Sequence, residues 1–289
     1  MPRTVLIVNP FASRVDEDRI AWVADVLGRP EVVRTEGPGH AAELVREAEA
    51  HAEAIYVFAG DGGFNEALNG TTGAVPLGFV PGGHTNVLSR ALGIPRDPIA
   101  AALALASARP RRISLGRVNG RRFGFSAGLG LDAELVRRVD ALGRDASGRR
   151  AGDLRFALTA LRVLAERRLR FDPALEVEGH GRVAFLLVAN CDPYTYAGLL
   201  PLRLAPAARF EAGLDAVGPR SFRLRHVPGA LVYLAVQRPA LPLLSLHDVD
   251  RLAVRCEGTT PLQVDGEDLG DVGEAAFEAE RGAAVVLVP

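Results

Sequence analysis

The feature that most constrains the fold of this chain is a glycine-rich turn placed directly after an apolar run. Residues 54–58 read Ala-Ile-Tyr-Val-Phe, and residues 59–63 read Ala-Gly-Asp-Gly-Gly before a helical pattern begins. A continuous apolar strand that ends in such a turn and enters a helix is typical of a parallel sheet covered on both faces. Glycine permits the tight turn and the close approach of a ligand, and the following helix N-terminus favours negative charge.

The first third of the chain repeats this alternation of strand and helix signals. Continuous apolar runs predict strands over 5–8, 31–34, 55–58 and 76–80, and apolar residues at helical spacing predict helices over 16–27, 39–54, 87–92 and 98–107. In parallel sheets, ligands bind beyond the carboxyl ends of the strands. The first, third and fourth of these strands all end in loop-forming residues, so we expect a ligand site at that edge.

The remainder of the chain predicts antiparallel structure. Asn119-Gly120 between the runs 113–118 and 123–126 is a strong hairpin signal. A helix is predicted over 160–169, and further strands over 183–189, 252–256, 262–264 and 284–288. The sequence therefore predicts two domains, 1–112 and 113–289, with the extreme C-terminal residues returning to the first domain as an alternative.

Composition excludes several classes of function. The formal charge of the 289 residues is -1, which does not support bulk attraction to nucleic acid. All 34 basic residues are arginine, so a phosphate loop of the Gly-Lys-Thr kind is excluded. Cys191 and Cys256 are too few for a disulfide framework or a Cys-rich zinc site. The apolar region Val227 to Leu246 is interrupted by prolines and predicts no transmembrane segment.

A second glycine-rich turn strengthens the prediction of phosphate chemistry. Residues 81–86 read Pro-Gly-Gly-His-Thr-Asn, in which Gly82 and Gly83 supply backbone donors, Thr85 supplies a hydroxyl and Asn86 can cap a helix. Either turn alone can be an ordinary turn or helix cap. Two of them after neighbouring strands can enclose the phosphates of one nucleotide. A carboxylate such as Asp61 beside phosphate implies an intervening divalent cation or hydroxyl, which favours phosphoryl transfer.

Near the C-terminus, residues 263–267 read Gln-Val-Asp-Gly-Glu. Alone this is a tight turn that carries two carboxylates. Asp265 and Glu267 can also serve as a general base and a supporting acidic group.

Six elements in order resemble the diacylglycerol kinase catalytic-domain family, which includes soluble bacterial lipid kinases and the sphingosine kinases. The elements lie at residues 8–10, 35–41, 60–70, 81–86, 127–133 and 265–267. The resemblance covers nearly the whole chain. It implies an α/β nucleotide domain of the NAD kinase/diacylglycerol kinase-like kind, a mainly antiparallel β-sandwich domain, and an active site in the cleft between them.

The resemblance also implies ATP and Mg²⁺ as the phosphoryl donor system, with the hydroxyl group of a diacylglycerol-like or sphingoid-like lipid as acceptor. Asp265 matches the family's general base, with Glu267 beside it, and Asp132 matches an acidic position that faces the acceptor. By position, the nucleotide site comprises Asn9, Thr35, Gly60, Asp61, Gly62, Glu66, Gly82, Gly83 and Asn86. We add Thr85 to this set, and we assign Asp61 to the magnesium ion that the nucleotide carries.

The chain departs from the family pattern at several places. The family's glycine-rich stretch after Asn-Pro is missing, with Ser13 and Arg14 offering a hydroxyl and a guanidinium instead, and His84 stands where a small or hydroxyl residue is common. Ala59 and Gly63 replace the outer residues of the usual Gly-Gly-Asp-Gly-Thr turn, and the acidic pair of the family's structural metal site is shortened, leaving Asp215 as the remaining candidate ligand. Two alternatives to a lipid kinase follow. One is a nucleotide- or lipid-binding protein that has lost catalysis, and the other is a kinase for a soluble acceptor such as NAD.

A lipid acceptor also requires an apolar groove, for which Phe123, Phe125, Leu129 and residues 194–204 are candidates; they are equally compatible with a domain core. We expect a cytoplasmic protein of lipid metabolism that meets its lipid substrate at the membrane surface and binds no nucleic acid. Homodimerisation is left open.

Overall fold

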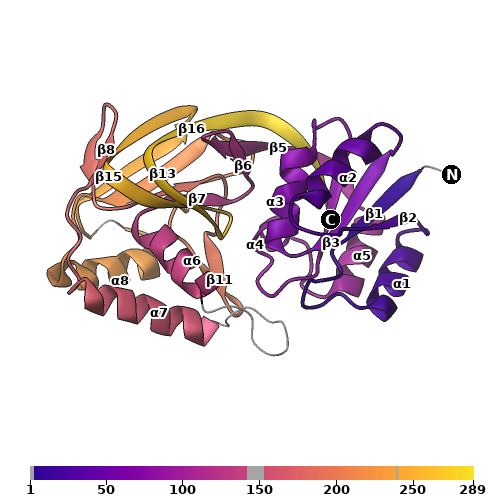
Figure 1. Ribbon diagram of the computed structural model, residues 1–289, viewed down its shortest axis with the longest axis horizontal. Helices are drawn as coiled ribbons and strands as arrows, with labels where there is room; N and C mark the ends of the chain where they lie inside the picture. Colours follow the sequence, from indigo (N-terminus) through magenta and orange to yellow (C-terminus); the bar gives the residue numbers. More distant parts are fainter. Residues whose placement is uncertain (1–2, 142–152, 239) are drawn as a thin grey trace. The chain divides into compact units, whose positions relative to one another are not determined.

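The computed structural model describes residues 3–141, 153–238 and 240–289, and its contacts divide the chain into two compact units. Unit 1 comprises Met1–Leu115 with Arg281–Pro289, and unit 2 comprises Gly116–Glu280. Figure 1 follows the chain through both. These units are defined by contacts, and the folding domains 1–112 and 113–289 stay a prediction from the sequence.

Unit 1 is built on a parallel sheet. Its strands are β1 (Thr4–Val8), β2 (Glu31–Arg34), β3 (Ala54–Ala59) and β4 (Leu77–Pro81), in the spatial order β2-β1-β3-β4. Val286, near the C-terminal end of β16 (Glu267–Val288), adds a parallel pair with Leu77 on the far side of β4. The residues of β1 and β3 are almost wholly buried, as their continuous apolar sequences predict.

Helices cover both faces of this sheet (Figure 1). Helix α1 (Glu17–Val26) packs with α5 (Pro98–Ala106), and α2 (His40–Glu49) packs with α3 (Asp61–Gly70), while α4 (Val87–Ala91) follows β4. Two helix starts are fixed by their own sequence. The Asp16 side chain accepts a hydrogen bond from Arg19 N, and Asp97 caps α5 ahead of a proline at its first position.

Unit 2 is built on antiparallel strands. The central order is β14-β13-β10-β7-β15-β16, with β8 paired to β15 and β9 paired to β8. The bounds of these strands are β7 (Ser126–Leu129), β8 (Leu175–Val177), β9 (Gly181–Val183), β10 (Leu186–Ala189), β13 (Leu214–Pro219), β14 (Leu243–Val249) and β15 (Arg251–Val264). The predicted hairpin is present, because β5 (Arg109–Val118) pairs with β6 (Arg121–Phe123) across Asn119-Gly120.

Three helices of unit 2 lie on the same side of its strands (Figure 1). They are α6 (Leu131–Ala141), α7 (Asp153–Glu166) and α8 (Val227–Val236), which is preceded by the short helix η1 (Leu224–His226). A separate hairpin joins β11 (Thr195–Ala197) to β12 (Leu200–Leu202). Within the described ranges, no helix combines the length and apolar character that a bilayer crossing requires.

The predicted fold class is confirmed: unit 1 is α/β with parallel strands, and unit 2 is mainly antiparallel. Several local predictions were wrong. The predicted strand 183–189 is divided between β9 and β10, because the N–H of Ala184, between them, donates to Pro219 O. The predicted strands 252–256 and 262–264 are one strand, β15, whose pairing shifts register between Arg255 and Thr260. The predicted helix 39–54 ends at Glu49.

Candidate functional site

The carboxyl ends of the four strands of unit 1 lie at one edge of its sheet. Thr35 N donates to Val8 O over 2.8 Å, and Asn9 N donates to Phe58 O over 3.0 Å. Ala59 and Pro81 are direct partners in the β3–β4 register. The sheet therefore brings together Asn9, Thr35 and the starts of both glycine-rich turns, all of which the sequence assigned to the nucleotide site.

The two glycine-rich turns approach each other at backbone distance. Gly82 N donates to Ala59 O over 2.7 Å. A Cβ atom on Gly83 would lie 2.8 Å from Gly60 Cα and 2.9 Å from Asn86 Oδ1, which is closer than real Cβ contacts come. Glycine at position 83 is thus required by packing, whatever else the turn does.

The first turn is shorter than the sequence predicts, because helix α3 begins at Asp61 itself. Gly60 is the N-cap residue, so no side chain caps the helix start. The carbonyl of Gly60 accepts a hydrogen bond from Phe64 N. The N–H groups in the first turn of a helix have no partner within that helix. Gly62 is exposed, with no atom within 4 Å of where a Cβ would stand. This end of α3 favours an anion and leaves room for one beside Gly62.

Three of the predicted nucleotide side chains contact protein backbone in the structure. Asp61 Oδ1 accepts from Leu88 N over 3.3 Å, at the start of α4. Asn86 is buried and hydrogen-bonds both the N–H and the carbonyl of Gly83. Glu66 Oε2 accepts from Ala41 N over 3.2 Å, in the first turn of α2. These side chains stabilise the turns and helix starts around the strand ends.

Arg14 is a basic residue that the sequence prediction left out of the site. Its backbone N–H donates to Gly82 O over 2.9 Å, and its guanidinium donates to Arg96 O over 3.3 Å. In a chain without lysine, Arg14 is a cation attached directly to the second glycine-rich turn. Only its place in the loop after Asn9-Pro10 could have indicated this from the sequence.

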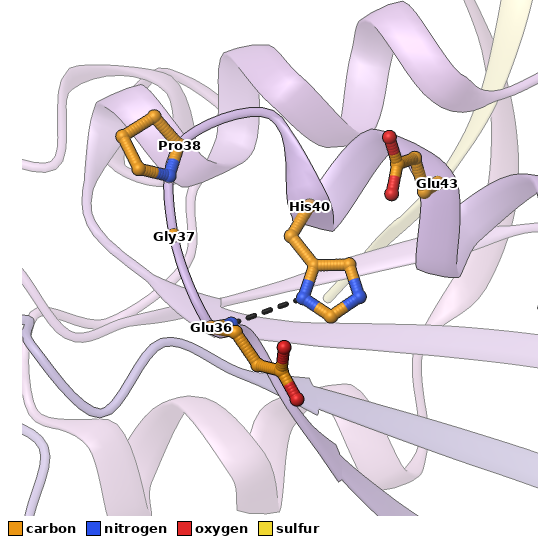
Figure 2. A pocket seen from close by; sticks show the side chains of 5 residues that line it. All are labelled: Glu36, Gly37, Pro38, His40 and Glu43. Carbon is orange, nitrogen blue, oxygen red and sulfur yellow. Dashed lines mark hydrogen bonds between the residues drawn. The ribbon is translucent and has the colours of Figure 1, made fainter.

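A shallow surface depression lies just after β2. Its lining is Glu36, Gly37, Pro38, His40 and Glu43, and Figure 2 shows His40 turned toward the backbone of Glu36. Glu36 N donates to His40 Nδ1 over 3.0 Å, so Nδ1 acts as an acceptor. Two carboxylates make the depression unsuited to phosphate.

In unit 2, Asp265 is held by backbone donors. It lies in the turn between β15 and β16 with φ of 48°, followed by Gly266 with φ of 79°, both in the left-handed region that tight hairpin turns use. Its Oδ2 accepts from Gly124 N over 2.7 Å, and its Oδ1 accepts from Phe125 N and Ser126 N over 2.9 and 3.0 Å. These bonds fix the orientation of a carboxylate that is only 6% exposed.

Asp132 is linked to the Asp265 turn through Gln263. Gln263 Nε2 donates to Asp132 Oδ2 over 2.6 Å, and Gln263 Oε1 accepts from Gly266 N over 2.8 Å. The hydroxyl of Tyr194 donates to Asp132 Oδ1. Burial raises the pKa of Asp132, and these two hydrogen bonds oppose that shift. The sequence analysis noted Gln263 in the 263–267 turn and Tyr194 in the candidate groove, but it could not predict that both contact Asp132, because neither motif names a partner.

Gly128 explains part of the motif at residues 127–133. A Cβ on Gly128 would lie 2.0 Å from Asp132 Oδ2, so the carboxyl group of Asp132 rests on the glycine of β7. Glu267 lies just beyond the Asp265 turn and forms a half-exposed ion pair with Arg121 at 3.0 Å. The three predicted catalytic carboxylates are therefore all near the β15–β16 turn, with Glu267 paired outward.

The contacts of Asp215 are not those of a metal ligand. Its Oδ1 lies 2.7 Å from His247 Nδ1 and accepts from Asp248 N over 3.1 Å. Magnesium prefers several oxygen ligands, but in the described part of the chain no three His, Cys, Asp or Glu side chains are grouped to hold a metal. These residues do not fit a structural magnesium ion, and Asp215 as a ligand stays a prediction without support from geometry.

The predicted apolar groove was wrong for three of its residues. Phe123, Phe125 and Leu129 are at most 5% exposed, and Phe123 and Leu129 belong to the core cluster of unit 2. Phe123 ends β6, and Leu129 ends β7, whose residues are all buried. Leu199 and Leu200, at the β11–β12 turn, are 75% and 73% exposed, so the remaining candidate segment is open to solvent.

Comparison with known proteins finds a family match for the N-terminal part. Residues 3–118 match the sequence model of the diacylglycerol kinase catalytic domain. These residues are therefore similar in sequence to the diacylglycerol kinase catalytic-domain family. This stretch contains every residue that we assigned to the nucleotide site.

Relatives and solved structures extend the comparison. The chain is 35% identical over 148 residues to a diacylglycerol kinase of Bacillus subtilis, covering 47% of this chain and 48% of that protein. It is 43% identical over 127 residues to a probable lipid kinase, YegS-like, of Pseudomonas aeruginosa, covering 42% of each. The chain thus spans about half the length of the curated relatives it matches. A diacylglycerol kinase structure from Bacillus anthracis matches 100% of this chain and 97% of its own, with a TM-score of 0.71 and 17% identity, which shows a shared fold alone.

The close approach of the two glycine-rich turns predicts the effect of adding one methyl group. Gly83→Ala should lower the free energy of unfolding by about 1–3 kcal/mol, because the new Cβ collides with the backbone of Gly60. Gly62→Ala is the matched control and should be neutral or stabilising by about 0.5–1 kcal/mol, since it adds a helix former in open space. Urea unfolding measures both. Equal stability of Gly83→Ala and wild type would contradict the close approach.

The environment of Asp132 predicts a pH dependence of stability. Its pKa is raised in the folded state, so the protonated form is favoured on folding, and this stabilisation is lost as the pH rises from about 4, the unfolded value, through the folded pKa. The stability of Asp132→Asn relative to wild type should therefore rise with pH, by about 1.4 kcal/mol for each pH unit of that window. Urea unfolding between pH 4 and 8 measures it.

Asp268→Asn is the control of opposite sign, and its unfolding is measured below pH 4 as well. Hydrogen bonds from Arg137 lower the pKa of Asp268, so its contribution is present above about pH 4 and is lost as the pH falls through the lowered pKa. A stability difference between Asp132→Asn and wild type that stays flat from pH 4 to 8 would contradict the raised pKa of Asp132.

Proposed function

We propose that this chain is an ATP-dependent lipid kinase that transfers the γ-phosphoryl group to a lipid hydroxyl. One observation carries the proposal: within the residues that match the family, two glycine-rich turns touch at the carboxyl edge of a parallel sheet, beside the N-terminus of α3. Backbone donors at a helix N-terminus suit phosphate. The names of the relatives from Bacillus subtilis and Pseudomonas aeruginosa support a lipid as the acceptor.

In this proposal, unit 1 binds the nucleotide. The N–H groups of residues 60–63 contact the phosphates, Thr85 adds a hydroxyl, and Asn9 and Thr35 contribute from the ends of β1 and β2. Gly82 and Gly83 shape the second turn, because their N–H groups donate to Ala59 O and Asn86 Oδ1. Glu66 and Asn86 hold the surrounding helix starts and turns in place. Arg14, whose backbone N–H donates to Gly82 O, is the cation that we assign to the phosphates at this edge.

Asp61 is the residue in these turns that fits a magnesium ion carried by the nucleotide. Magnesium in kinases is held by one or two carboxylates together with substrate phosphates, and Asp61 supplies a carboxylate at the first turn. The ion would supply neutralisation of the phosphate charge. The protein's own contribution is to keep Asp61 oriented, which its bond from Leu88 N does.

In unit 2, we assign the general base to Asp265. Its carboxylate takes the proton of the lipid hydroxyl while the hydroxyl oxygen attacks the γ-phosphorus, and the bond to the β,γ-bridging oxygen breaks to release ADP. Three backbone N–H groups keep the carboxylate in one orientation. Asp132 faces the acceptor in this assignment, and Glu267 supports the base from the far side of the turn.

The acceptor belongs to the diacylglycerol-like or sphingoid-like lipids, and the reaction belongs to phospholipid metabolism on the cytoplasmic face of a membrane. The experiment is a phosphorylation assay with labelled ATP and Mg²⁺ against diacylglycerol, sphingoid bases and NAD. Turnover on a lipid supports the proposal. Turnover on NAD alone would replace it with a soluble-acceptor kinase, and ATP binding without any turnover would favour a protein that has lost catalysis.

Removing the base tests the role of Asp265. Asp265→Asn should lower kcat by at least about 10²-fold, the usual scale for a positioned base, and should abolish the acidic limb of the pH profile of kcat/KM. Glu267→Gln, which breaks only the half-exposed pair with Arg121, should cost much less. A purely structural role would lower the melting temperature but leave the pH profile of the remaining activity unchanged, and that result would overturn the assignment.

A further inference from the structure

Helix α8 of unit 2 exposes an apolar stripe that has the spacing of a buried face. Its residues Pro228, Leu231, Val232, Ala235 and Val236 are all exposed, and they recur at intervals of three, four, seven and eight. That spacing places them on one side of a helix, where a globular protein would bury them. Leu231 is 61% exposed and Val236 is 57% exposed.

The opposite side of α8 is attached to unit 2 by specific contacts. Tyr233 is the buried residue of the helix, and its hydroxyl donates to Leu204 O over 2.6 Å. Gln237 Nε2 donates to Arg203 O over 3.3 Å just after the helix ends. A Cβ on Gly229 would lie 2.4 Å from Ala240 O, so the backbone of α8 approaches the following segment closely. The stripe is therefore presented outward on a helix that is held in place.

All acidic and basic charges in the sequence around the stripe are positive. Residues 216–247 contain four arginines and no aspartate or glutamate. Two of the arginines flank α8: Arg225 precedes it and Arg238 follows it, and both are exposed. Arg225 donates to His226 Nε2, and throughout the described ranges no carboxylate pairs with Arg225 or Arg238. An apolar helix face flanked by cations matches an anionic lipid surface, where the side chains enter the acyl boundary and the cations meet head groups.

We propose that α8 is a membrane-docking helix, with Leu231, Val232 and Val236 inserting into the interface of an anionic bilayer and Arg225 and Arg238 contacting its head groups. The purpose of the docking rests on the proposed function, since a kinase for a membrane lipid must reach the bilayer. The binding itself is a separate property and is measured without turnover. Figure 1 shows α8 with α6 and α7 on one side of the strands of unit 2.

The test is flotation of the full chain with vesicles of phosphatidylcholine alone and of phosphatidylcholine with phosphatidylserine. Wild type should bind the anionic vesicles, less at high salt. The double variant Leu231→Gln/Val232→Gln should bind at least about tenfold more weakly, because two apolar side chains are lost from the interface. Arg225→Gln and Arg238→Gln should each weaken binding to anionic vesicles by about fivefold and leave binding to neutral vesicles unchanged. The matched control is Leu103→Gln on α5, which removes an equally exposed leucine, 59% exposed, from unit 1 and should not change binding.

Two results would overturn the proposal: wild-type binding that is absent, or binding that the α8 variants leave intact. Light scattering, which measures the oligomeric state, tests whether a second copy of the chain covers the stripe instead. If Leu231→Gln/Val232→Gln converts a dimer to a monomer while vesicle binding persists, the stripe is an interface between copies of the chain. Vesicle binding that depends on α8, in a chain that phosphorylates no lipid, would contradict the proposed function and leave the docking helix standing.

Discussion

The backbone contact between Gly60 and Gly83 is the constraint on which the candidate nucleotide site depends. Ala59 and Pro81 are partners in the parallel pairing of β3 with β4, so both turns start at the same level of the sheet. The two segments that follow these strands must therefore leave the same edge side by side. Only glycine admits the resulting distance. The helix starts that follow are then fixed by short side-chain contacts, such as Asp61 to Leu88 N. Donors held in this way need little reorganisation to receive a phosphate.

The second unit uses a different device, in which carboxylates are positioned by hydrogen bonds rather than by steric fit. Asp265 receives three backbone donors, and Gln263 connects its turn to Asp132. Buried polar groups of this kind are costly unless each has partners, so the network specifies one arrangement of the turn. The same bonds that stabilise the turn also set the direction in which a carboxylate can accept a proton.

The sequence predicted the parts of the fold that depend on local pattern. The strands of unit 1 were recognised because they are continuous apolar runs, and the hairpin because Asn119-Gly120 suits a tight turn. Helix α8 was missed because it is apolar on all sides and interrupted near its start by Pro228 and Gly229, so no helical period stands out. Apolar character alone also does not place a residue inside: Trp22 is 60% exposed, because α1 buries Ile20 and Val23 on its other side.

The candidate site shows the same division. Motifs located the turns and Asp265, but the partners of Asp132 lie 62 and 131 residues away along the chain, and sequence pattern carries no information about such contacts. The start of α3 at Asp61, which makes the first turn a helix N-terminus, also required the structure, because the glycines there weaken the helical signal. The assignment of these residues to a nucleotide remains the proposal.

Backbone hydrogen exchange with and without ATP and Mg²⁺ tests the central claim most directly. If the two glycine turns hold the phosphates, the amides of residues 60–63 and 82–86 will exchange more slowly when ATP is bound, and AMP, which lacks the β- and γ-phosphates, will protect them far less. Protection by ATP elsewhere in the chain, with these two segments unchanged, would contradict the account.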